Sequence, residues 1–151
     1  MQPLHQMPIK PDELRAQIKL LEAAVKADKA ERRAAEKPVR DARQTLMGGI
    51  RSALASVDRY NQIIANELHS KGKGWFCDHY KISEAEKSLA TASALFQSRL
   101  DTLKVFDALH NVEAEDYPRL PVLDREATVA AGKADREAMM AKFRSQQIKW
   151  S

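Results

Sequence analysis

The first 47 residues carry a single apolar seam, and this seam limits the folds open to the chain more than any other feature. Its members recur at alternating intervals of four and three residues: Leu14, Ile18, Leu21, Val25, Ala35, Val39, Ala42 and Leu46. Such spacing places a narrow stripe along one side of a helix, and a stripe of this kind is buried against another helix. In its middle the same phase falls on Asp28 and Arg32, which weakens the seam there. The seam therefore predicts long helices that pack on other helices.

The composition supports the same fold class. The chain has 151 residues, of which 44% are hydrophobic, 30% are charged and only 6% are aromatic. This balance suits an alanine-rich helical protein better than a β-sandwich or an enzyme with a large sheet. We predict an all-α fold, either an extended helical hairpin or a bundle of three to five helices, with coiled-coil-like heptad packing. An irregular amino-terminal arm over 1–10, which contains two prolines, would precede one all-helical domain over 11–151.

Four helices are expected, over about 11–47, 49–70, 83–110 and 124–148. The first begins at Pro11, a residue that the first turn of a helix tolerates. Because Pro38 removes a backbone donor and clashes with the preceding turn, we expect a kink in this long amino-terminal helix near residues 34–38. At Gly48-Gly49 the chain either reverses or continues with a local shift of phase. We favour continuation, because two residues make a short turn between helices.

The later helices have their own signals. After Gly49 an apolar stripe resumes with Ile50, Ala53, Val57, Tyr60 and Ile64. The next helix would start at Ser83, which forms a capping box with Glu86. It supplies most of the core through Ala85, Leu89, Ala92, Phe96, Leu100, Leu103 and Phe106. Asp124 is suited to cap the last helix, whose stripe is rich in alanine and therefore predicts a close approach to another helix: Ala127, Ala131, Ala134, Ala138, Ala141, Ser145 and Ile148.

The segment from Lys71 to Lys81 is the best candidate site, because it gathers aromatic residues, bases and the single thiol of Cys77 in one loop. One interpretation is contact with single-stranded nucleic acid, in which aromatic rings stack on bases and lysines meet phosphates. The residues involved would be Lys71, Lys73, Trp75, Phe76, Tyr80 and Lys81. The other is that Trp75 and Phe76 close the end of the helical core while the lysines are solvated. We favour the second interpretation.

No pattern in the chain indicates catalysis, a metal or a cofactor. Cys77 lies beside His79, but paired Cys or His spacings of a four-ligand site are missing, and no base or oxyanion donors for a thiol nucleophile are identified. There is also no Walker loop, dinucleotide fingerprint or nucleophile elbow. We expect a non-enzymatic protein with no cofactor, no metal site and no small-molecule substrate, in which the thiol is structural.

The amino terminus lacks the apolar core of a signal peptide, and no stretch is long and apolar enough for a membrane span. The expected location is therefore the cytoplasm or a macromolecular assembly. At the carboxyl end, Met139, Phe143 and Trp150 lie close together on a helical projection and are flanked by bases. They either dock on a partner or cover the end of the bundle, and the two interpretations stand equal.

These features predict a function exerted through helix-mediated self-association or the binding of a protein partner. The partner-binding residues would be Leu14, Ile18, Leu21, Val25, Met139, Phe143 and Trp150. The alternative is a nucleic-acid-binding protein that uses the aromatic loop and basic helix faces. In residues 26–43, however, interleaved acids balance much of the basic charge. A role as a virion or mobile-element component fits this style of protein, but that is an analogy and rests on no motif.

Overall fold

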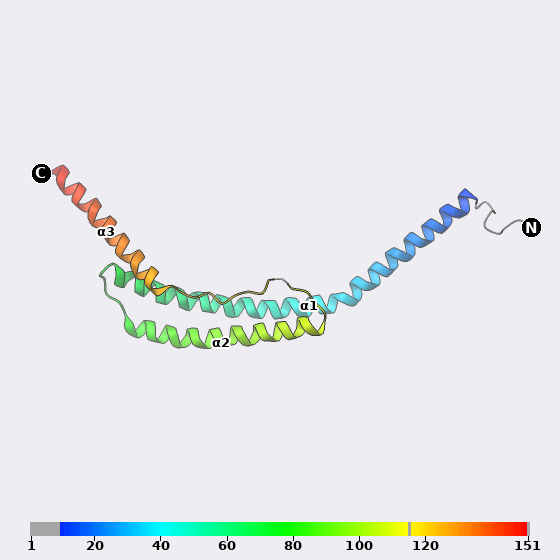
Figure 1. The fold of residues 1–151 in the computed structure, drawn as a ribbon, viewed down its shortest axis with the longest axis horizontal. Coiled ribbons are helices and arrows are strands. Elements are labelled where there is room, and N and C mark those ends of the chain that lie inside the picture. The colour runs from blue at the N-terminus through cyan, green and yellow to red at the C-terminus, as the bar shows by residue number, and fades with distance from the viewer. Residues whose placement is uncertain (1–9, 115, 151) are drawn as a thin grey trace, which may run out of the picture. The chain divides into compact units, whose positions relative to one another are not determined.

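The computed structural model describes residues 10–114 and 116–150, and in this part of the chain every regular element is a helix. Three helices follow one another: α1 over Pro11–Gly72, α2 over His79–Leu109 and α3 over Arg125–Trp150 (Figure 1). The predicted all-α class is confirmed, with three helices. The predicted irregular arm, apart from Lys10, lies outside the described residues.

The chain divides into two compact units, Met1–Gln44 and Thr45–Ser151. The described part of the first unit is the amino-terminal part of α1, where only Val39 and Arg43 are half-buried and every other residue is exposed. Within this unit nothing covers the apolar seam. The second unit contains the rest of α1 and all of α2 and α3, and both clusters of buried hydrophobic residues lie in it.

α1 continues through both positions at which the sequence suggested an interruption. Pro38 lies inside the helix. The kink predicted there stays a prediction. The two helices expected over 11–47 and 49–70 are one helix, because Gly48 and Gly49 both take helical conformation. At Gly49 the Arg99 guanidinium of α2 donates a hydrogen bond of 2.6 Å to the backbone carbonyl oxygen. This hydrogen bond joins α2 to α1 at Gly48-Gly49, where the sequence also allowed a reversal of the chain.

The core of the second unit lies between α1 and α2, which run side by side (Figure 1). One cluster joins Ile50, Ala53, Phe96, Leu100 and Leu103, and the other joins Ile64, Leu68, Ile82 and Ala85. Seven of these nine residues belong to the stripes that the periodicity predicted, and Leu68 and Ile82 do not. Tyr60, Leu89 and Phe106, which complete those stripes, are half-buried. A two-helix core of this kind covers one side of each helix and leaves the other side for further contacts.

α2 begins at His79, earlier than the predicted start at Ser83. Asp78 is the actual cap, because its side-chain oxygen accepts a hydrogen bond of 3.1 Å from the Lys81 backbone nitrogen. Ser83 therefore lies inside the helix. Glu86, the expected partner in the capping box, instead forms an ion pair of 2.7 Å with Arg125 at the start of α3. The capping-box pattern was present in the sequence, but a stronger cap lay upstream of it.

The segment between α2 and α3 runs back along the helical pair (Figure 1). α2 ends at Leu109, and Asn111 takes a positive φ of 52° that turns the chain. Along the return path Tyr117 packs on the first core cluster and Leu123 on the second. The Asn61 amide also donates to the Pro121 carbonyl at 3.4 Å. This segment thus acts as a strap over the hairpin of α1 and α2.

α3 meets α1 through a pair of glycines. Its cap is Asp124, as predicted, whose side chain accepts from the Ala127 backbone nitrogen at 3.0 Å. A Cβ at Gly72 would strike the Val129 carbonyl, and a Cβ at Gly132 would strike the His69 carbonyl. Only glycine permits this approach of two backbones. The close crossing was predicted, but the residues were wrong: the alanine stripe from Ala127 to Ala141 is exposed, because Gly132 determines which face of α3 contacts α1.

Candidate functional site

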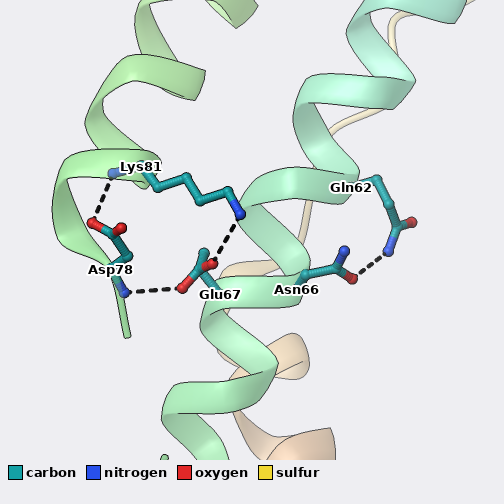
Figure 2. A network of polar contacts seen from close by, with 5 residues as sticks. All are labelled: Gln62, Asn66, Glu67, Asp78 and Lys81. Carbon is teal, nitrogen blue, oxygen red and sulfur yellow. Dashed lines mark hydrogen bonds and ion pairs between the residues drawn. The ribbon is translucent and has the colours of Figure 1, made fainter. Parts of the chain in front are cut away.

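The connection between α1 and α2 is fixed to the body of the second unit by a small polar network (Figure 2). The Glu67 carboxylate of α1 accepts a hydrogen bond of 2.9 Å from the Asp78 backbone nitrogen. Its other oxygen lies 3.7 Å from the Lys81 ammonium. Because the Glu67 side chain is only 16% exposed, this pairing is better shielded than a surface ion pair. The network therefore holds both ends of the first turn of α2 on α1.

Two aromatic residues of this connection project into solvent. Phe76 is 85% exposed and Trp75 is 58% exposed, and the nearby Tyr80 on α2 is also exposed. The favoured interpretation, that Trp75 and Phe76 close the end of the core, is wrong. Cys77 and Leu68 take that position instead, because Cys77 packs against the second core cluster. The Lys73 ammonium lies 4.7 Å from the centre of the Trp75 ring. This cation-π contact stabilises the exposed position of the ring.

Next to this loop, the end of α1 and one face of α3 line a hollow with a volume of about 580 Å³. We call it the basic hollow. It is lined by Lys71, Gly72, Gly74, Lys133, Arg136, Glu137, Met140, Ala141 and Arg144. The lining residues of α3 recur at helical spacing, so one face of that helix supplies them. Four cations and a single carboxylate therefore meet at the end of α1.

The four cations of the hollow are not held in ion pairs by the described part of the chain. In the described ranges, none of Lys71, Lys133, Arg136 and Arg144 forms an ion pair, whereas the acid Asp135 is bound to His69 at 2.9 Å. The Arg136 guanidinium also packs close to Gly74, whose φ is +75°. A side chain at Gly74 would displace that guanidinium. The glycine contacts therefore bring the basic face of α3 against the loop.

The three lysines of the predicted loop site have different surroundings. Lys71 lines the hollow, Lys73 lies over Trp75, and Lys81 is held by Glu67. Sequence reasoning missed the three cations of α3, because they are distant from the loop along the chain. Their helical spacing was a usable signal, but only the contact between Gly72 and Gly132 places them beside Lys71.

The predicted partner-binding residues lie in two separate places. Leu14, Ile18, Leu21 and Val25 belong to the first unit and are between 46% and 66% exposed. On α3, Met139 and Phe143 are 50% and 59% exposed, and the Trp150 side chain lies outside the described residues. Partner docking by the α3 residues stays a prediction.

No group of three or more potential metal ligands occurs in the described part of the chain. Cys77 is half-buried in the core cluster, and His79 beside it is exposed. Over the same residues, no helix has an apolar stretch that would cross a bilayer. Comparison of the chain with protein-family models, with curated proteins and with solved structures finds no match.

Proposed function

We propose that this protein acts through helix-mediated assembly and not as an enzyme, by pairing the seam of the first unit with the same seam of a second copy. One observation carries the proposal. The described part of the first unit is a single helix whose apolar stripe is interrupted by Asp28 and Arg32, and within that unit the stripe is exposed except at the half-buried Val39. Helices in proteins gain most of their stability from packing on an apolar face. A second helix is the element that a stripe of this width accepts.

The charges in the middle of the seam favour an antiparallel pair of copies. Asp28 and Arg32 occupy stripe positions, and their side chains lie 3.4 Å apart on the same helix. In a parallel, in-register pair each would face its own counterpart and therefore a like charge. In an antiparallel pair centred between them, Asp28 of one copy faces Arg32 of the other.

The same antiparallel register matches the apolar residues on either side of the charged layers. It places Val25 opposite Ala35 and Leu21 opposite Val39 of the second copy, so that a larger side chain meets a smaller one in each layer. Glu22 then approaches Glu36 of the second copy. Each of these acids has a base four residues later on its own helix, Lys26 and Arg40, which offsets their repulsion.

A matched pair of substitutions tests the seam. Leu21 and Leu20 are adjacent, similarly exposed at 66% and 71%, and differ in that only Leu21 lies on the stripe. Leu21→Ser removes apolar area from both copies, so we expect the dissociation constant to rise on the order of 100-fold. Leu20→Ser should leave it nearly unchanged. Sedimentation equilibrium measures both, and equal effects of the two variants would contradict the proposal.

Cysteine cross-linking tests the orientation in a Cys77→Ala background. In the antiparallel register, Val25→Cys and Ala35→Cys lie opposite one another only when the two variants are mixed. We therefore expect a disulfide-linked dimer from the mixture and none from either variant alone, because identical positions would be about 15 Å apart. Cross-linking of each variant with itself would indicate a parallel pair and reject this register.

A further inference from the structure

We infer that the basic hollow, together with the exposed aromatic residues beside it, is a binding site for single-stranded nucleic acid. The inference does not depend on the proposed assembly, because every residue in it belongs to the second unit. It rests on three features. Cations without ion pairs to described residues line the hollow, exposed aromatic residues directly follow one of its lining residues in the sequence, and a contact between two glycines holds α3 against the end of α1.

The charge of the hollow suits a chain of phosphates. Lys133, Arg136 and Arg144 follow one face of α3 over about 16 Å of helix, and Lys71 faces them from the end of α1. A linear polyanion can therefore meet several of these cations at once. Because none of these cations is held in an ion pair with a described residue, the counterions that they displace from a nucleic acid contribute to affinity.

The aromatic residues favour an unpaired strand. Trp75 and Phe76 directly follow Gly74, whose backbone lines the hollow, and both are exposed. Exposed rings stack on unpaired bases and tolerate any sequence. An anionic membrane is a poorer match, because a helix that lies on a bilayer needs a broad apolar face flanked by bases. Among the residues of α3 that line the hollow, the only apolar side chains are Met140 and Ala141.

The backbone contact makes the site a built feature of the second unit. Gly72 and Gly132 fix the approach of α3 to α1, and Gly74 leaves room for the Arg136 guanidinium. Neither the loop nor α3 alone brings both kinds of residue together. The site is consequently sensitive to substitutions that move α3, and insensitive to changes in the first unit.

The binding test uses the full chain and a fluorescently labelled oligothymidylate of about 20 nucleotides, with anisotropy measured over a series of salt concentrations. Lys133→Gln should weaken binding and reduce the slope of log affinity against log salt by about 0.7. Lys142→Gln makes the same charge change on α3 but lies outside the hollow. It should leave the slope unchanged, and equal effects of the two variants would overturn the inference.

Substitution of the single acid tests the site by a gain of binding, which a folding defect does not produce. Glu137 lines the hollow, whereas Glu113 is an exposed acid in the segment between α2 and α3 and lies outside it. Glu137→Gln should bind the oligonucleotide several-fold more tightly, since it removes a repulsion near the phosphates. Glu113→Gln should have the smaller effect. Equal or reversed effects would contradict the assigned site.

The stacking role is tested at Trp75. Trp75→Ala should weaken binding by about 5-fold to 150-fold, while Trp75→Phe, which keeps a ring, should retain most of the affinity. In a Trp150→Phe background, the fluorescence of Trp75 should be quenched on addition of the oligonucleotide. An unchanged affinity in Trp75→Ala would reject stacking.

Competing ligands complete the test. A duplex of matched length should bind more weakly than the single strand, because its bases are already stacked. Vesicles that contain anionic phospholipid should compete poorly. Binding of the duplex as tight as that of the single strand would overturn the preference for unpaired strands, and stronger binding to the vesicles would assign the hollow to a lipid surface.

Discussion

At the scale of single residues, the most demanding position is Asp107, a carboxylate that is only 1% exposed on the buried side of α2. The Tyr117 hydroxyl donates a hydrogen bond of 2.9 Å to it, and Tyr117 itself packs on the first core cluster. The Val112 backbone nitrogen donates to the Asp107 carbonyl at 2.9 Å. One residue therefore connects the end of α2 to the start of the return segment.

Removing the hydroxyl of Tyr117 should weaken this connection. Tyr117→Phe keeps the ring but loses a hydrogen bond to a buried acid, so we expect a loss of about 1.5–3 kcal/mol in the free energy of unfolding. Tyr80→Phe removes a hydroxyl from an exposed ring and should change stability by less than about 0.5 kcal/mol. Urea denaturation measures both, and indistinguishable stabilities would show that the bond contributes nothing.

At the scale of elements, glycines have opposite roles at different points of the helices. Gly72 and Gly132 permit two helix backbones to touch, whereas a Cβ at Gly48 would meet nothing within 4 Å. The first two are required by packing, while Gly48 only adds conformational freedom to the unfolded chain. The docking of α3 on α1 thus depends on the absence of side chains at two positions.

This contrast predicts that alanine substitutions at the two kinds of glycine have opposite effects on stability. Gly132→Ala forces a Cβ into the His69 carbonyl, so α3 should lose its contact with α1. Hydrogen exchange of the backbone amides in the first turns of α3 should then accelerate. Gly48→Ala should instead stabilise the protein by about 0.5–1 kcal/mol, because alanine is the better helix former. Slower or unchanged exchange in Gly132→Ala would show that the contact between α3 and α1 does not protect these amides.

At the scale of the whole molecule, the two units differ in how their helices are supported. The second unit covers its apolar stripes with a second helix and a strap, while the described part of the first unit exposes its stripe. A helix without tertiary packing frays and depends on its own propensity. The stability of the first unit should therefore depend on protein concentration, and that of the second should not.

Far-ultraviolet circular dichroism at decreasing protein concentration checks this expectation. Helicity should fall on dilution as pairs of the first unit dissociate, and the midpoint should move to higher concentration in Leu21→Ser but not in Leu20→Ser. The urea transition of the second unit should stay constant over the same range. A helical signal that is independent of concentration would indicate that the first unit needs no partner.

The sequence alone determined most of the residues that are buried in the hairpin, although it did not indicate Leu68 and Ile82. Ile50, Val57 and Ile64 on α1, and Phe96 and Leu103 on α2, are buried as their spacing predicted. The reason is that helical periodicity is a local property: the interval between apolar residues fixes a face wherever the helix lies. The cap at Asp124 was equally local, because it depends on one side chain and the following turn.

Only the tertiary structure decided how distant segments meet. Gly132 selects the contacting face of α3 because Gly72 lies opposite it. The exposure of Trp75 was also beyond sequence reasoning, since the position it would have filled is taken by Cys77 and Leu68. Such outcomes depend on competition among segments far apart in the chain for the same space, and no local pattern records that competition.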